Sequence, residues 1–210
     1  MTKITVEQAP GPTPYFYVWM AVVCLLVAFG GFAPTYWLQL PAGTFVGPPL
    51  LHLHGALFSA WAVFLVWQAT LAARGQLRSH RAWGLLGISL ATAIVIIGIT
   101  TAIGTLQHGL AAGYGDRSRS FFVLPISAIS MFAGFFIAAI ANVRRPEAHK
   151  RLMLLATISL LGAAMARVFF VLMTGGGPGL RPGLGPPPPM FIALVPSLLL
   201  ELFIVAGIVY

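Results

Sequence analysis

Six long apolar runs, separated by short polar connections, dominate this sequence. They cover residues 15–38, 50–72, 83–107, 121–142, 152–173 and 190–210. An α-helix needs about 20 apolar residues to cross the hydrocarbon core of a bilayer, and each run is long enough. Only 8% of the residues are charged, whereas soluble domains have roughly 25%. The sequence therefore predicts an all-α integral membrane protein, with a tail over 1–14 and a single domain of six transmembrane helices over 15–210.

Basic residues lie mostly in the connections on one side of the predicted membrane. Those on that side are Lys3, Arg74, Arg78, Arg81, Arg144, Arg145, Lys150 and Arg151, and those on the other side are Arg117, Arg119 and Arg181. Because cytoplasmic loops carry an excess of Lys and Arg, this bias predicts a multi-pass protein of the bacterial inner (cytoplasmic) membrane with both termini in the cytoplasm. Topology also accounts for the net charge of +8, so we expect bound anionic lipids and no nucleic acid partner.

An internal repeat relates the middle four runs. His80 begins the third run and His149 begins the fifth, 69 residues later, and each is followed by a basic residue. The repeat units cover about 50–107 and 121–173, and each consists of two runs joined by a short basic connection. Repeats that run in the same direction are related by an axis along the membrane normal. We therefore expect a central four-helix bundle built from two parallel helical hairpins, with the first and sixth helices beside it.

Three histidines fall near the predicted outer surface, namely His52, His54 and His108. Imidazole is a ligand for zinc and copper, so one interpretation is a metal site formed by all three. On a helix, however, residues two apart point about 200° apart. His52 and His54 can then share a site only if the chain is still extended at His52. Interfacial histidines bonded to water or head groups, or a haem ligand, are the other interpretations.

Two further histidines, His80 and His149, fall near the predicted inner surface at matching places in the two hairpins. One interpretation is a bis-histidine haem b between the hairpins, with a second haem at His54 and His108, so that electrons cross the bilayer. The other is structural, because a histidine at a helix start can cap the helix or bind a lipid phosphate.

Two charged residues, Arg167 and Glu201, lie inside apolar runs. A charge at such depth is costly unless it is paired or hydrated, so we expect an intramembrane ion pair between them. Alternatively, Arg167 holds an anionic head group, a haem propionate or a quinone carbonyl. The sequence has only four acidic residues, which disfavours a hydrolase with paired carboxylates, and we expect no catalytic residues. The lone Cys24 excludes an internal disulfide.

The connection over 174–189 is rich in glycine and proline, with a run of four prolines at its end. Such a tract forms little structure of its own apart from a short polyproline II rod. We expect the tail from Met1 through Pro14 and the loop from Gly175 through Pro189 to contact other membrane subunits.

The order of motifs resembles a group of uncharacterised bacterial inner-membrane protein families with the pattern H…HRxxG…HxRxM…R. The motifs are a histidine at the start of the second run (His52 or His54), His80-Arg81-Ala82-Trp83-Gly84, His149-Lys150-Arg151-Leu152-Met153 and Arg167. They cover about residues 50–170, and the loop and His108 are not part of the pattern. The families are of the domain-of-unknown-function type, and some relatives are tied to the assembly of haem-copper oxidases.

Two functional hypotheses follow. The first is a non-catalytic accessory subunit, structural or for assembly, in a respiratory or photosynthetic complex. The second is an electron-transfer membrane protein that binds haem b, copper or a quinone. Its candidate ligands are His52, His54, His80, His149 and Arg167.

Overall fold

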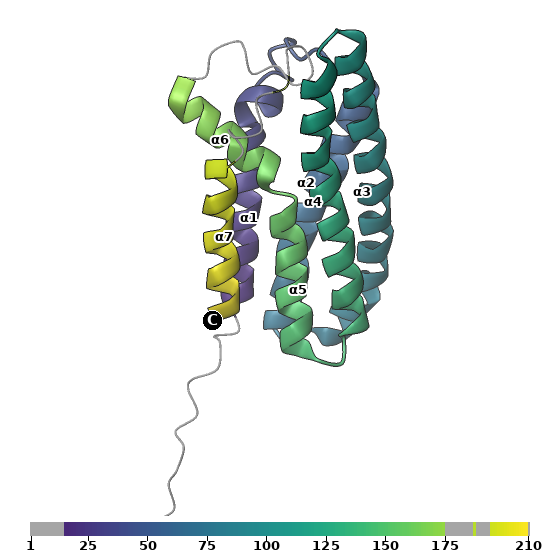
Figure 1. Cartoon of the computed structure of the whole chain (residues 1–210). Helices are drawn as coiled ribbons and strands as arrows, with labels where there is room; N and C mark the ends of the chain where they lie inside the picture. Colours follow the sequence, from purple (N-terminus) through teal and green to yellow (C-terminus); the bar gives the residue numbers. More distant parts are fainter. Residues whose placement is uncertain (1–14, 175–186, 188–193, 210) are drawn as a thin grey trace, which may run out of the picture.

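The computed structural model describes residues 15–174, 187 and 194–209, and every regular element in this part of the chain is helical (Figure 1). The elements are α1 (Phe16–Phe32), the π-helical turn η1 (Ala33–Trp37), α2 (Pro49–Ala73), α3 (Leu77–Ala111), α4 (Gly115–Ala141), α5 (Pro146–Ser159), α6 (Gly162–Thr174) and α7 (Leu194–Val209). The prediction of an all-α protein is confirmed. The tail over 1–14 and nearly all of the Gly/Pro loop lie outside the described residues.

Four helical segments are long and apolar enough to cross a membrane. They are Phe16–Trp37, Pro49–Ala73, Leu77–Ala111 and Gly115–Ala141, and they correspond to the first four predicted spans. Large apolar side chains cover their outer surfaces, as with Trp19 (68% exposed) and Leu85 (71% exposed). Contiguous apolar surface of this extent is unfavourable in water and suits lipid. The chain is therefore a multi-pass membrane protein.

The fifth predicted span is not one continuous helix, although α5 and α6 together are long and apolar enough to count as one broken span. Helix α5 ends at Ser159, α6 begins at Gly162, and the two are bent by 49°. Two tightened main-chain bonds mark the break, from Leu160 N to Thr157 O (3.1 Å) and from Leu161 N to Ile158 O (2.9 Å). A nearby Ser and Gly are a common cause of such a bend, because serine bonds back to the main chain and glycine tolerates the distortion. The sixth predicted span appears as the shorter apolar helix α7.

The four helices α2 to α5 pack around one apolar core, as the predicted central bundle requires. Each helix pair adjacent in sequence is in contact. The buried core residues are Trp61, Ala91, Ile94, Phe132, Phe136 and Ala156. Trp61 Nε1 donates a 3.1 Å hydrogen bond to Thr157 Oγ1 and so links α2 to α5 across the bundle. This bond closes the ring of helices without exposing a polar group to lipid.

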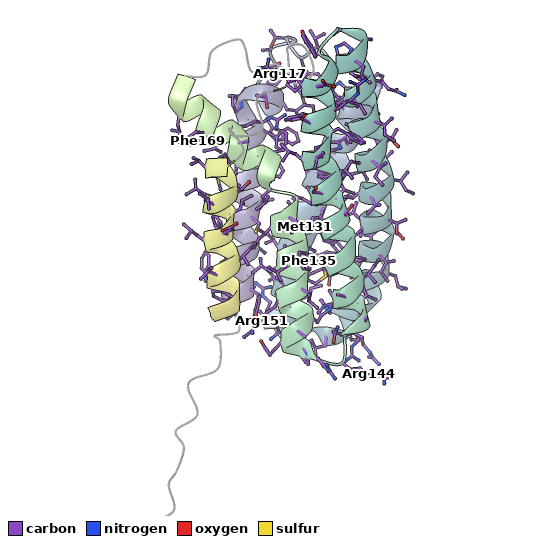
Figure 2. All side chains as sticks on the ribbon, viewed as in Figure 1. Arg117, Met131, Phe135, Arg144, Arg151 and Phe169 are labelled. Carbon is purple, nitrogen blue, oxygen red and sulfur yellow. The ribbon has the colours of Figure 1, made fainter. Side chains whose placement is uncertain are left out.

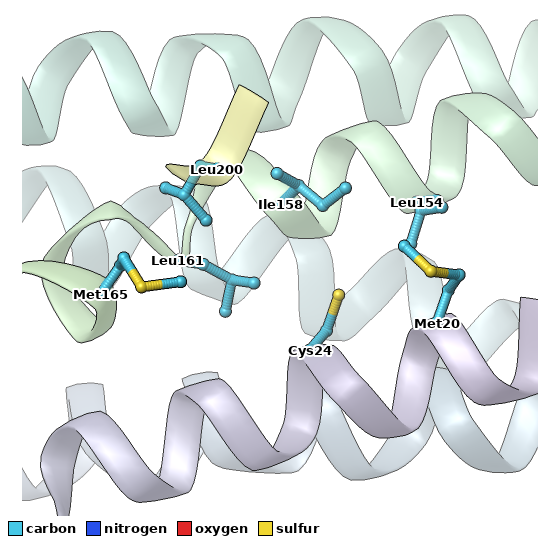
Figure 3. Packing of buried hydrophobic residues seen from close by; sticks show 7 residues of the cluster. All are labelled: Met20, Cys24, Leu154, Ile158, Leu161, Met165 and Leu200. Carbon is cyan, nitrogen blue, oxygen red and sulfur yellow. The ribbon is translucent and has the colours of Figure 1, made fainter. Parts of the chain in front are cut away.

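A second apolar cluster attaches α1, α6 and α7 to the bundle (Figure 3). Its buried members are Met20, Cys24, Leu154, Ile158, Leu161, Met165 and Leu200. The Cys24 thiol lies among these methionine, leucine and isoleucine side chains (Figure 3). Because α5 contributes to both clusters, it positions the flanking helices relative to the central bundle.

Gly31 allows α1 to lie directly against α6, and we expect Gly31→Ala to destabilise the fold. A Cβ atom at Gly31 would lie 2.8 Å from Cα and 2.7 Å from the carbonyl carbon of Ala164. These are main-chain atoms that cannot rotate away, so the helices must separate, at a cost of about 1–3 kcal/mol. Reversible unfolding in mixed micelles with sodium dodecyl sulfate, followed by circular dichroism, measures the change.

The neighbouring Gly30 is the matched control, because nothing lies within 4 Å of a Cβ atom placed there. Gly30→Ala is expected to leave the free energy of unfolding unchanged or to raise it by about 0.5–1 kcal/mol through better helix propensity. Equal destabilisation by the two substitutions would contradict the close contact between α1 and α6.

Candidate functional site

Helix α2 presents three polar or aromatic side chains to the bundle at intervals of seven residues. They are His54, Trp61 and Gln68, and seven residues are almost two full turns, so all three share a face. Trp61 is 2% exposed and Gln68 is 6% exposed. His54 and Gln68 are 14 residues apart, which is about 21 Å along the helix axis. This face therefore connects two separate regions near opposite ends of the bundle.

His80 is held at one end by the short turn between α2 and α3. Gly75, with φ of +72°, allows the chain to reverse there. The first helical turn of α3 then lies beside the last turns of α2. His80 Nδ1 is 3.3 Å from the main-chain oxygen of Gln68.

His149 is held in the same way by the turn between α4 and α5. Its Nδ1 is 2.9 Å from the main-chain oxygen of Ala139, in the last turn of α4. A bond from Arg145 N to Asn142 O (2.8 Å) closes the turn. Each hairpin thus ties a histidine at the start of its second helix to a carbonyl near the end of its first.

The two histidine rings lie next to each other, with centroids 6.2 Å apart and planes at 86°. We call these two residues the histidine pair. A carbonyl oxygen only accepts hydrogen bonds, so Nδ1 of each neutral ring carries the hydrogen and Nε2 keeps a free lone pair. Metal-binding histidines in proteins are held in this way, with the second ring nitrogen bonded to a carbonyl or carboxylate.

The surroundings of the histidine pair are basic. Arg144 and Arg151 lie at the end of the bundle that holds the α2–α3 and α4–α5 turns, and Arg117 lies at the other end (Figure 2). We call the first of these the basic end. The acidic Glu147 at this end is paired with Lys150 at 2.8 Å. Buried polar atoms without a hydrogen-bond partner there are Gln68 Oε1, Gln68 Nε2, Arg151 Nε and the hydroxyl of Tyr17, whose ring lies under Lys150 Nζ.

These groups fit some metal cofactors and not others. Two neutral nitrogen donors would suit a haem iron or a copper ion, and arginines would suit haem propionates. A structural zinc site needs four protein ligands and a catalytic one needs three. Within the described part of the chain no group of three or more His, Cys, Asp or Glu side chains is close enough to hold a metal. The histidine pair therefore fits haem or copper better than zinc.

The predicted three-histidine metal site is wrong. His52 is exposed. Its Nδ1 shares a 3.0 Å hydrogen bond with Tyr36 Oη, and its ring packs on Phe45. His54 turns inward and stacks on Phe58, with ring centroids 4.1 Å apart. The reason is that α2 already begins at Pro49, so the two rings diverge by about 200°. His108 is exposed in the last turn of α3 and offers no buried partner for His54.

The predicted ion pair between Arg167 and Glu201 is also wrong. Arg167 Nη1 donates instead to Ala163 O at 2.9 Å, and its guanidinium lies 4.5 Å from the centroid of the Phe32 ring. Glu201 is exposed on α7. Among described residues the ion pairs are those of Arg119 with Asp116 and of Lys150 with Glu147. Arg167 lies beyond the 49° bend between α5 and α6, and its side chain meets Phe32 at the end of α1.

Sequence reasoning missed two site residues, Gln68 and Thr157. Gln68 was recognisable as an amide on the same helical face as His54. Thr157 carried no such signal, because a threonine in a helix usually bonds back to its own main chain. It does so here with Met153 O (3.1 Å) while also accepting from Trp61.

No family model, no curated protein and no solved structure matches this chain, so the resemblance to inner-membrane families stays a prediction and function is inferred from the geometry alone.

Proposed function

We propose that this chain is a histidine-ligated redox protein of the bacterial cytoplasmic membrane, which holds haem b or a copper ion between His80 and His149. The observation that carries the proposal is the 6.2 Å separation of the two rings, each tied through Nδ1 to a main-chain carbonyl. Metal–imidazole bonds are about 2.0–2.1 Å long. Two such bonds would be compatible with rings whose centroids are 6.2 Å apart.

Each part of the site has a distinct task in this proposal. The carbonyls of Gln68 and Ala139 fix the tautomer and the orientation of the two rings. Arg81, which follows His80 directly in the sequence, and Arg151 supply positive charge for propionates. A bound haem iron or copper ion would take up and release one electron.

The second candidate function is an accessory or assembly subunit of a respiratory or photosynthetic complex. It is favoured by α6, which leans away from the rest of the bundle (Figure 1) and carries Leu172, 78% exposed, in its last turn. A helix that leaves the bundle offers apolar surface for packing against another membrane subunit. The tail and the Gly/Pro loop, which we expect to contact such subunits, lie outside the described residues.

One experiment separates the two functions. The protein is purified gently from its native membrane, its absorption is recorded before and after dithionite, and its metal content and co-purifying chains are determined. We expect either a Soret band that shifts on reduction or about one copper per chain. A colourless, metal-free protein that co-purifies with stoichiometric partner chains would contradict the redox proposal and favour the accessory subunit.

The same proposal places the basic end in the cytoplasm, and cysteine labelling tests this orientation. Cys24 is the one cysteine of the chain, so it is first replaced by alanine. Val143→Cys lies at the basic end and Ala112→Cys in the exposed turn at the opposite end. We expect a membrane-impermeant maleimide to label Ala112→Cys in spheroplasts and Val143→Cys only after lysis. The reverse pattern would contradict the positive-inside assignment.

A further inference from the structure

Glu201 is a carboxylate near the middle of α7, and neither the histidine pair nor the central bundle uses it. Helix α7 covers Leu194–Val209, so about 10 Å of helix precede Glu201 and about 12 Å follow it. Leu200, the residue before it, packs in the same buried cluster as Cys24 (Figure 3). Cys24 lies well inside the span Phe16–Trp37. Glu201 is therefore at the depth of the hydrocarbon, where a short acidic side chain does not reach the head groups of either leaflet.

Glu201 belongs to a row of exposed side chains on the side of α7 that faces away from the protein. The other members are Leu198, Leu202 and Val205, each more than half exposed. Positions three, four and seven residues apart lie on one face of a helix, so the four residues form one stripe, which we call the α7 stripe. Leu200, on the other side of the helix, is buried in the cluster with α1. Helix α7 lies at the edge of the molecule (Figure 1), where the stripe is open to the surroundings.

The other acidic side chains among the described residues are paired and lie at helix ends. Asp116, in the first turn of α4, forms an ion pair with Arg119, and Glu147, in the first turn of α5, forms one with Lys150. Within the described part of the chain Glu201 forms no ion pair. Charged residues inside membrane spans almost always face the protein interior or a charged partner, because lipid does not solvate them. A partner outside this chain would supply what Glu201 lacks.

We propose that the α7 stripe is the docking surface for a transmembrane helix of another subunit, and that this helix carries a lysine or arginine at the depth of Glu201. Charge complementarity identifies the partner, because an ammonium or guanidinium group neutralises the carboxylate and forms a charge-assisted hydrogen bond with it. The apolar members of the stripe supply the packing contacts on either side. A single polar position in an otherwise apolar helix interface also fixes the register and selects the partner.

A second copy of this chain fits the α7 stripe less well. In a symmetric dimer the same patch contacts itself, so two Glu201 carboxylates would face each other and repel. The described basic residues other than Arg167 lie in turns or in the first two turns of helices, away from the middle of the membrane. Arg167 is engaged within its own chain, where it donates to Ala163 O and lies on the Phe32 ring. The described part of the chain therefore offers no free cation at this depth to a neighbouring copy.

Photocrosslinking in the native membrane tests the proposal. Leu202, next to Glu201 on the stripe, is replaced by p-benzoylphenylalanine in the full-length chain. The matched control carries the same group in place of Leu85, which is equally exposed but lies on α3. We expect position 202 to give one discrete product with another protein, and mass spectrometry to identify the crosslinked peptide as an apolar membrane segment that contains a lysine or arginine. Position 85 should not give this product.

Three variants made in the chain with the crosslinker at position 202 test the charge itself. Glu201→Gln keeps the shape of the side chain and removes its charge, so the yield of the product should fall about tenfold or more, as expected when one member of a desolvated charge pair is removed. Glu201→Asp keeps the charge and should retain most of the yield. Asp116→Asn removes an exposed carboxylate at the end of α4 and should leave the yield unchanged. Circular dichroism on the purified variants checks the fold.

Three results would overturn the proposal. The first is crosslinking of position 202 to lipid only. The second is a crosslinked peptide from this chain itself, which assigns the stripe to a second copy. The third is a product whose peptide has no basic residue, or whose yield is the same in Glu201→Gln, because the docking is then apolar and the carboxylate has no part in it.

The proposal does not rest on the histidine pair, and the two are tested separately. The Soret band or the copper content is measured on the purified Glu201→Gln variant, and it should equal that of the unmodified chain because the histidine pair belongs to α3 and α5. The accessory-subunit function is likewise distinguishable. Partner chains that co-purify unchanged with Glu201→Gln would support that function while they remove the α7 stripe as the contact surface.

Discussion

Replacement of either His80 or His149 by alanine is expected to lower the occupancy of the bound haem or copper at least tenfold. Each histidine is one of only two nitrogen ligands in the proposed site, and the main-chain carbonyls that orient them cannot substitute as ligands at the same place. Loss of a residue that merely orients a metal ligand typically costs 10–100-fold in affinity, so loss of the ligand itself should cost no less. Absorption at the Soret band, or copper per chain, measures the effect.

His108→Ala is the matched control, because His108 lies on α3 like His80 but is exposed. It should keep full occupancy. Circular dichroism on all three variants checks that the bundle is intact. Full occupancy in both His80→Ala and His149→Ala, with the fold retained, would remove the basis of the redox proposal. Loss in only one of them would indicate a single axial ligand rather than a pair.

The parts of this site that sequence reasoning predicted are those fixed by short connections. His80 and His149 follow short turns, so their level in the membrane follows from the span boundaries alone. Their matching positions, 69 residues apart, then predict that they lie at the same end of the bundle. The structure adds that the two rings are adjacent and bonded to carbonyls, which depends on side-chain rotation that no pattern of residues specifies.

Arg167 shows why the rest was not predictable. Counting residues along an uninterrupted fifth span placed it opposite Glu201. The break after Ser159 changes the direction of the helix by 49° and carries the arginine to Phe32 on α1 instead. Main-chain bonds at Leu160 and Leu161 lie at the break, and beyond it α6 packs on α1 and α7. A local sequence of apolar residues with one serine and one glycine is compatible with either path.

The face of α2 is an intermediate case. Helical periodicity groups His54 with Trp61 and Gln68, and the burial of Trp61 and Gln68 agrees with it, while His54 is half-buried. What periodicity leaves open is whether the helix has already begun at His52, because element boundaries are less certain than periods. The structure has Pro at the first helical positions of α2, where its fixed φ suits a helix start. That start separates His52 from His54 and excludes the three-histidine metal site.

Trp61→Ala is expected to lower the free energy of unfolding by about 3 kcal/mol or more, the largest effect on stability that we expect for one substitution. Trp61 is 2% exposed. The centroid of its ring lies 5.1 Å from that of Phe132 and 5.7 Å from that of Phe136, and its Nε1 donates a hydrogen bond to Thr157 Oγ1. In a membrane, the transfer of an apolar side chain from lipid to the protein core adds little to the free energy of unfolding, because both surroundings are apolar. The loss therefore comes from packing contacts and from the hydrogen bond between α2 and α5.

Two further variants separate these contributions. Trp61→Phe keeps most of the ring contacts and removes the donor, so it should cost about 0.6 kcal/mol, the average for a hydrogen bond between membrane helices. Trp19→Ala truncates a tryptophan that is 68% exposed toward lipid, and it should leave the free energy of unfolding unchanged. Unfolding in sodium dodecyl sulfate micelles, followed by circular dichroism, gives all three values. If Trp19→Ala costs as much as Trp61→Ala, the core between α2 and α5 does not determine stability. If Trp61→Phe costs as much as Trp61→Ala, the hydrogen bond, rather than packing, holds the two hairpins together.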